Sequence, residues 1–234
     1  MNSATKPVNI FAVGAVHAYL EAACKLPGFS HFNLALSFAP AGVINEQVRT
    51  GKQADIIITT AHAIDALARD GFVLDDSAIS VGVVDLALAQ RTNDPPLAMP
   101  NAEALRGLLL NSDAIYLPDT AHSTAGRHIA RVLDELGIAT AVSSKLHQFA
   151  NGAAAMQALA DSDKTSPIGF TQRPEIAGVK NLAARSALPA PFVLLTHYMA
   201  ALSVRSAQQP DAQKIISLIC DPDLKLLRQR YHLA

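Results

Sequence analysis

The sequence lacks long basic runs and long apolar runs. No basic stretch exceeds three residues, and 19 basic residues are nearly balanced by 20 acidic ones. We therefore expect neither nucleic acid nor an anionic membrane as a partner, because both require a concentrated positive surface. Apolar runs such as 192–195 are far shorter than the roughly 20 residues of a membrane-spanning helix, so we expect no membrane insertion.

Cysteine is scarce, with two residues in the chain. Cys24 and Cys220 lie in expected helices near opposite ends of the chain. Buried free thiols are the simpler interpretation, and one disulfide is the alternative.

Residues 1–7 contain neither the apolar core nor the cleavage site of a signal peptide. We expect a cytoplasmic protein if the chain is complete as given, and a periplasmic one if a signal peptide was removed.

Apolar strands and helical patterns alternate along almost the whole chain, which predicts an α/β fold with a mainly parallel sheet. Half of the 234 residues are apolar, enough for one large or two small domains. The expected strands are 8–13, 34–38, 55–59, 79–88, 114–117, 140–143, 166–170 and 179–183, and the expected helices are 16–26, 42–50, 63–69, 101–110, 124–136, 152–160, 211–219 and 223–231. Segments 79–88 and 192–204 are long and apolar, and we expect them to cross between two similar halves.

Four apolar strands run into turns of small residues that open directly into helices. These junctions follow Val13, Phe38, Thr59 and Leu117. The first N–H groups of a helix lack intrahelical acceptors, and open α/β sheets bind ligands at the carboxyl ends of their strands. Helix N-termini at that edge favour negative charge. The sequence therefore predicts a small anionic ligand.

Three of the eight histidines fall at these junctions: His17, His62 and His122. A histidine there can donate a hydrogen bond to an anion or move a proton. A solvated histidine without function is the alternative for each. We expect no metal, because no two histidines stand four residues apart and no Cys or Glu cluster accompanies them. We expect no cofactor either, because the glycine patterns that bind nucleotides are absent, as is the nucleophile motif Gly-x-Ser-x-Gly.

Polar residues are concentrated around the fourth junction. One of Thr120, Ser123 and Thr124 is expected to cap the following helix, which leaves the others free to bind a ligand. Arg127 lies in the first turn of that helix, where a cation opposes the helix dipole. A compensating anion explains this placement, and an arginine that points into solvent is the alternative.

Several stretches, taken in order, resemble a known superfamily. Residues 38–42 (Phe-Ala-Pro-Ala-Gly) precede 48–58, which contains the pattern Gly-x-x-Ala-Asp followed by an apolar strand. Residues 117–126 then give a loop rich in small and hydroxyl residues, followed by 131–137, and the chain closes with 211–230. Together they resemble the type II periplasmic-binding-protein superfamily, specifically its molybdate-binding-protein-like branch of ABC transporter substrate-binding proteins.

The resemblance implies a two-lobed α/β fold. Each lobe is a mainly parallel sheet flanked by helices, and two crossing strands join the lobes around a cleft that closes over a bound anion. The lobes are expected at 1–84 plus 196–234 and at 85–195. Together with the side chains considered above, the expected ligand-binding residues are Gly14, Ala15, Val16, His17, Ala39, Pro40, Ala41, Thr60, Ala121, His122, Ser123, Thr124, Ala125, Arg127, Asn151, Gly152, Thr171 and Tyr198.

Two of these side chains have structural alternatives, and two positions depart from the family pattern. Thr171 sits where the family often contributes a side chain, but it equally fits a simple turn. Tyr198 could reach the cleft or be a buried aromatic residue. The serines that usually cradle a tetrahedral oxyanion are replaced here by Ala15 and Ala41. This departure favours an organic carboxylate over molybdate.

Three functions stay open, so the sequence does not decide whether the chain is an enzyme. The first is a solute-binding protein that captures a small anion by hinge closure, with an ABC permease as partner if it is exported. The alternative is an isomerase of the aconitate isomerase type on the same scaffold, with His17 or His122 as the base that moves a proton in a small di- or tricarboxylate. A cytoplasmic ligand sensor is a third option.

Overall fold

A computed structural model describes residues 6–234 of the chain. These residues form two compact units. Unit 1 takes the described residues up to Val83 and His197–Ala234, and unit 2 takes Val84–Thr196. The chain passes from one unit to the other inside two long strands, β4 (Ile79–Arg91) and β9 (Leu195–Leu202). The predicted α/β class is confirmed, and both long apolar segments contain strands.

Unit 1 is built on strands in the order β2-β1-β3-β9. β1 (Val8–Ala12) pairs in parallel with both β2 (Leu34–Phe38) and β3 (Ile56–Thr60), while β9 pairs antiparallel with β3. The three parallel strands therefore end at the same edge of the sheet, and the next helix begins there each time.

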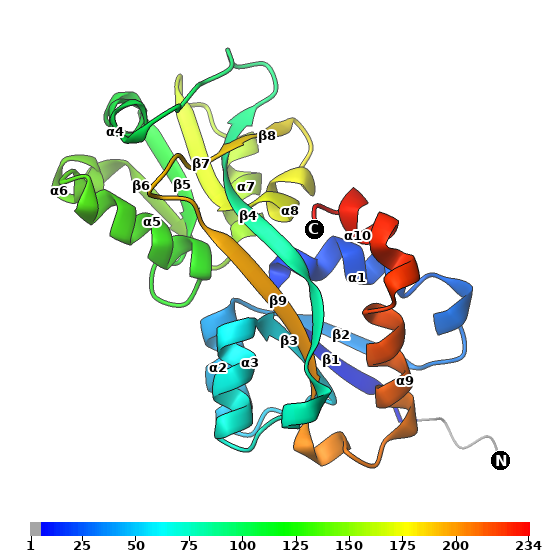
Figure 1. The fold of residues 1–234 in the computed structure, drawn as a ribbon. Coiled ribbons are helices and arrows are strands. Elements are labelled where there is room, and N and C mark those ends of the chain that lie inside the picture. Colours follow the sequence, from blue (N-terminus) through cyan, green and yellow to red (C-terminus); the bar gives the residue numbers. More distant parts are fainter. Residues whose placement is uncertain (1–5) are drawn as a thin grey trace. The chain divides into compact units, whose positions relative to one another are not determined.

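Helices cover both faces of the unit 1 strands (Figure 1). α2 (Ala41–Arg49) and α3 (Ala61–Arg69) lie on one face, while α1 (His17–Ala23), α9 (Pro210–Ile219) and α10 (Lys225–Arg230) lie on the other. The buried Tyr19 hydroxyl of α1 donates to the Ile219 carbonyl, which joins α1 to α9. The carboxylate of Asp55, before β3, accepts from Asn9 N and from Ser206 Oγ, each at 2.7 Å. These contacts tie segments distant in sequence to the strands.

Unit 2 is a second α/β layer structure with strands in the order β8-β4-β7-β5-β6. β5 (Ala114–Pro118) pairs in parallel with β6 (Leu146–Phe149) and β7 (Pro167–Gln172). β4 pairs antiparallel with β7 and with β8 (Leu182–Ala187). The carboxyl ends of β5, β6 and β7 therefore share one edge.

The alternation of side chains along these strands divides the core of unit 2 in two. Ile115 and Leu117 of β5 pack in one cluster with α4 (Ala102–Asn111), α5 (Thr124–Glu135) and α6 (Ala139–Val142). Ala114 and Tyr116 pack in the other with α7 (Gly152–Ala160) and α8 (Arg173–Ala177). Successive strand residues point to opposite faces, so the sheet is buried on both sides.

Two expected strands are misplaced in the sequence prediction. Residues 140–143 were expected as a strand, but they lie in and after helix α6, and the strand is β6, at 146–149. Ile138 and Val142 are both buried and four residues apart, which suits one face of a helix. The strand expected at 179–183 is β8, which begins at Leu182 because Asn181, with φ of 64°, forms the preceding turn.

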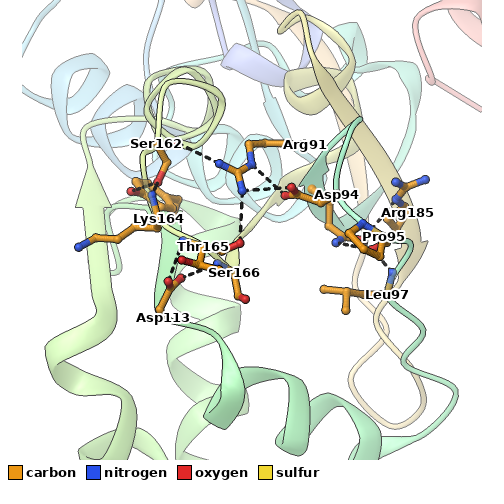
Figure 2. Close-up of polar contacts among 12 residues, drawn as sticks. Arg91, Asp94, Pro95, Leu97, Asp113, Ser162, Lys164, Thr165, Ser166 and Arg185 are labelled. Atoms are coloured by element: carbon orange, nitrogen blue, oxygen red, sulfur yellow. Dashed lines mark hydrogen bonds and ion pairs between the residues drawn. The ribbon is translucent and has the colours of Figure 1, made fainter.

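The segment after β4 is held by a polar cluster at the amino ends of β5 and β7 (Figure 2). The Arg91 guanidinium makes a two-pronged pair with Asp94 at 2.9 and 3.1 Å, and it donates to the Ser162 carbonyl at 3.0 Å. The Asp113 carboxylate accepts from the amides of Thr165 and Ser166. These groups satisfy one another at the edge of unit 2 opposite the carboxyl ends of β5 and β7, so we interpret the cluster as structural.

Two helical glycines of unit 2 allow a matched test of this packing. A Cβ at Gly126 would lie 2.2 Å from the Asp119 carbonyl oxygen and 2.5 Å from that of Pro118. A Cβ at Gly107, inside α4, would meet no atom within 4 Å. We expect Gly126→Ala to lower the free energy of unfolding by about 1–3 kcal/mol and Gly107→Ala to raise it by about 0.5–1 kcal/mol. Urea denaturation measures both, and a Gly126→Ala protein as stable as the wild type would contradict this packing.

Candidate functional site

The predicted ligand residues of unit 1 lie at one edge of its sheet. A short 3-10 turn (Gly14–Val16) follows β1, α2 follows β2, and α3 follows β3. Because these strands are parallel neighbours, the three turns are neighbours too. The ring of His17 packs against that of Phe38 with centroids 4.2 Å apart, which brings the first two junctions together.

Main-chain N–H groups at this edge are left without acceptors. The amides of Val16 and Ile44 bond to the carbonyls of Val13 and Pro40. Amides that have no acceptor among the described residues are those of Gly14, Ala15, Ala41, Gly42 and Val43. Such donors suit an anion, and the dipole of the nine-residue helix α2 adds to the attraction.

The polar side chains of unit 1 are less available than its amides. The Thr60 hydroxyl caps α3 by accepting from Ala63 N at 3.3 Å. His17 is exposed and lies 3.2 Å from the Glu21 carboxylate one turn later. Tyr198 is 3% exposed and pairs with Thr60 across β3 and β9. Main-chain groups are therefore the principal donors that unit 1 offers at this edge.

The fourth junction, after β5, is closed by an internal carboxylate. Asp119 Oδ1 accepts from the amides of Ala121 at 2.9 Å and His122 at 2.6 Å, and it lies 2.9 Å from His122 Nδ1. The amide of Ser123 bonds to the Asp119 carbonyl. Three amides expected to face a ligand thus bond within the loop.

These bonds keep Asp119 ionised. The backbone N–H of His122, helped by its ring and by the amide of Ala121, lowers the pKa of Asp119 below its ordinary value. A lowered pKa in the folded state means that this stabilisation is present above the ordinary pKa of aspartate and is lost as pH falls through the lower, folded-state pKa. The Asp119 carboxyl is therefore ionised at neutral pH.

The starts of α5 and α7 supply the open amides of unit 2. Ser123 caps α5 and Asn151 caps α7, each through its side chain. Arg127 donates to the Ala121 carbonyl at 3.0 Å, so its guanidinium holds the loop. Amides without an acceptor in the described part of the chain are those of Thr124, Ala125, Gly152 and Ala153.

Gly152 and Thr171 are brought together by a residue that the sequence analysis missed. The Thr171 hydroxyl donates to Glu175 Oε2 at 2.6 Å. A Cβ on Gly152 would lie 2.2 Å from both of these oxygens. The carboxyl of Glu175 therefore rests directly against the first residue of α7. Burial raises its pKa, against the lowering effect of hydrogen bonds from Thr171 and from the backbone of Gln172.

Both missed acids have recognisable local signals. Asp119 precedes the amides that it accepts by two and three residues, which is the pattern of an Asx turn. Glu175 is the third residue of α8, the position from which Glu reaches back to the N-cap amide, here that of Gln172. These two rules, applied to the sequence, would have placed the side chains of Asp119 and Glu175 just after β5 and β7.

The remaining candidates have structural partners. His128, which we did not single out, is buried, lies 2.8 Å from the Phe192 carbonyl oxygen through Nε2, and has a pKa lowered by burial. Cys24 and Cys220 are free thiols, and burial raises the pKa of Cys220 to about 12. Within residues 6–234, no three His, Cys, Asp or Glu side chains are grouped to hold a metal. Over the same residues, every helix is too short or too polar to cross a membrane.

Comparison with known proteins gives a consistent picture of the fold. Residues 14–225 match the family described as "Bacterial extracellular solute-binding protein". The periplasmic molybdate-binding protein of Azotobacter vinelandii superposes with a TM-score of 0.78, at 16% identity over 97% of this chain and 98% of that one. PEB3 of Campylobacter jejuni with L-phospholactate bound gives a TM-score of 0.68, at 16% identity over 96% and 98% of the two chains.

One relative in sequence is named as an enzyme. The chain is 24% identical over 179 residues to a protein named "Aconitate isomerase" from a Pseudomonas species. The match takes 76% of this chain and 65% of that protein, so the chain spans less than two thirds of the relative's length.

The Asp119 loop predicts a specific titration. In His122→Ala the ring is removed but the backbone N–H, the largest cause of the lowered pKa, is kept. We therefore expect the pKa of Asp119 to stay below its ordinary value of about 3.9 in the variant as in the wild type. Carboxyl ¹³C NMR measures it. A return to the ordinary value in the variant would show that the ring, not the main chain, holds the carboxylate.

Proposed function

The chain belongs to the family of bacterial extracellular solute-binding proteins, and we propose that it captures a small organic carboxylate through main-chain amides. The observation that carries this proposal is the set of open N–H groups at the starts of α2, α5 and α7 and at Gly14 and Ala15. Every one of these starts lies at the carboxyl end of a parallel strand.

Side-chain chemistry supports a carboxylate over a tetrahedral metal oxyanion. Ala15 and Ala41 are buried and have no hydroxyl to offer. A carboxylate presents two oxygens in one plane, which two successive helix-start amides can bond. PEB3, a structural neighbour, is described with L-phospholactate, an organic acid that carries a carboxylate together with a phosphate.

One helix start does not suffice for capture. A hydrogen bond to a charged group contributes about 1.5–3 kcal/mol, whereas association costs roughly 4–15 kcal/mol in lost freedom. Several amide pairs must therefore act on one ligand. In the proposal, loops of both units contribute, and closure of the units on the ligand adds the contacts of the second set. Delivery to an ABC permease follows if the protein is exported.

A thermal-shift panel tests the ligand class. A ligand that binds only the folded state raises the melting temperature by mass action. We expect trans-aconitate or malonate to raise it, and molybdate to leave it unchanged. The reverse result would contradict the carboxylate preference, and no shift with any anion would contradict the proposed function.

A proline substitution removes one main-chain N–H donor from the proposed site, and the thermal-shift experiment can test its effect. Ala41 is the first residue of α2, and Pro40 before it has φ of −59° and ψ of 150°, which a following proline tolerates. We expect Ala41→Pro to weaken binding of the anion that stabilises the wild type by roughly 10- to 100-fold. Ala102→Pro, at the first residue of α4, is the matched control and should bind as the wild type does.

One observation favours a second function, proton transfer in a tricarboxylate. His122 Nδ1 lies 2.9 Å from Asp119 Oδ1, and His122 Nε2 has no partner in the described structure. A carboxylate that orients one ring nitrogen prepares the other to act as a base. The relative named aconitate isomerase supports this chemistry. The base would remove a proton from one carbon of the substrate and return it to another.

Proton NMR of trans-aconitate in D₂O distinguishes a binder from an isomerase. The isomerase hypothesis predicts deuterium incorporation and a second isomer, both lost in His122→Ala. His62→Ala, an exposed histidine in the first turn of α3, should retain them. Unchanged substrate signals with the wild type, under conditions where it binds, would exclude the isomerase and leave the binding function standing.

A further inference from the structure

Glu175 is a half-buried acid beside the proposed anion site, and the proposed function does not use it. Its carboxyl accepts from the Thr171 hydroxyl and from the Gln172 backbone. The second bond is the reciprocal half of a capping box for the short helix α8. Capping requires only the Gln172 amide, so it does not explain why the carboxyl lies against another helix.

The helix that it touches is α7, whose first amides are open. Gly152 is buried and has no side chain to separate its backbone from Glu175 Oε2. The amides of Gly152 and Ala153 do not donate to this carboxyl, so they are available to a ligand. An anion bound to these amides would lie close to the Glu175 carboxyl, which touches the first residue of the same helix.

Among residues 6–234, no cation acts on the Glu175 carboxyl. The elements packed against α8 are β8, α7 and β7. Neither α7 nor β7 has a titratable side chain. In β8, Arg185 donates to Gln90. In α8 itself, Arg173 is paired with the Asp85 carboxylate and donates to the Arg185 carbonyl.

We propose that Glu175 takes up a proton from solvent when an anion binds at the start of α7, and that this proton turns Thr171 into a donor for the ligand. Two negative charges in one partly buried space repel each other strongly. With Glu175 ionised, the Thr171 hydroxyl hydrogen is used on Oε2. With Glu175 protonated, its O–H donates to Thr171 Oγ1, which frees the threonine hydrogen for the anion.

This inference rests on the proposed function. It predicts that the affinity of the protein for the anion depends on pH. Because the bound state holds one more proton, affinity should fall as pH rises, by up to about tenfold per pH unit above the pKa of Glu175 in the free protein. Burial, which raises the pKa of Glu175, brings this dependence toward neutral pH. Glu175→Gln carries no titratable group, so its affinity should lack this component.

Isothermal titration calorimetry with trans-aconitate measures the proton directly. Titrations in two buffers of different ionisation enthalpy give the number of protons taken up per anion bound. We expect the wild type to take up more than Glu175→Gln, by up to about one proton. Protons that the ligand itself gains or loses contribute equally to both proteins and cancel in the difference. Glu103→Gln, an exposed acid in α4, is the matched control and should behave as the wild type.

The possible outcomes separate a failure of this inference from a failure of the proposed function. Equal proton uptake in wild type and Glu175→Gln would overturn the inference and leave the proposed function intact. No binding of trans-aconitate or malonate by the wild type would overturn the proposed function itself. If Glu175→Gln does not fold, the ¹³C resonance of the Glu175 carboxyl in the wild type is compared with and without trans-aconitate. A shift toward the protonated form supports the inference, and an unchanged carboxylate signal contradicts it.

Discussion

Parallel pairing of neighbouring strands is the constraint on which the rest of the structure depends. β1 pairs in parallel with β2 and β3 in unit 1, and β5 pairs in parallel with β6 and β7 in unit 2. Parallel pairing forces the carboxyl ends of these strands to one edge of each unit. Short turns then start α2, α5 and α7 at that edge, where their first amides have no acceptor in the part of the chain that the structure describes. The proposed anion site follows from topology more than from any particular side chain.

Two acidic side chains of unit 2 lie beside these helix-start amides, and one of them uses some of the amides itself. Asp119 uses amides of its own loop, so the open donors near β5 are those of Thr124 and Ala125. Glu175 lies beside the open amides of α7 without using them. Unit 2 therefore places two carboxyl groups close to its open amides. Under the proposed function, an anion must outweigh or neutralise any charge on these carboxyls, which limits the anions that can bind.

The sequence predicts the order of elements well because each strand is an apolar run and each helix start has small or capping residues. It fails where a local pattern is ambiguous. Residues 140–143 include a β-branched pair, yet Ile138 and Val142 are spaced for a helix face and α6 packs by them. The start of β8 depends on a left-handed turn at Asn181, which alternation of apolar residues does not reveal.

The candidate site is predictable in its main-chain part only. Strand ends and small residues place the helix starts, but the choice of which amides stay open depends on side-chain partners distant in space or reached by a turn. Thr171 meets Gly152 only because β7 pairs with β5 and α7 packs across both. No pattern along the chain gives this contact. The role of His122 changes likewise once Asp119 is seen to orient its ring.

Amide chemical shifts of the ¹⁵N-labelled protein, followed while trans-aconitate is added, test the central claim most directly. Anion binding by helix-start amides predicts that the largest shifts fall on Gly42, Ala125 and Gly152, with little change at the start of α4. Saturating shifts confined to α4 or to the polar cluster around Arg91, with these three amides unmoved, would contradict the account.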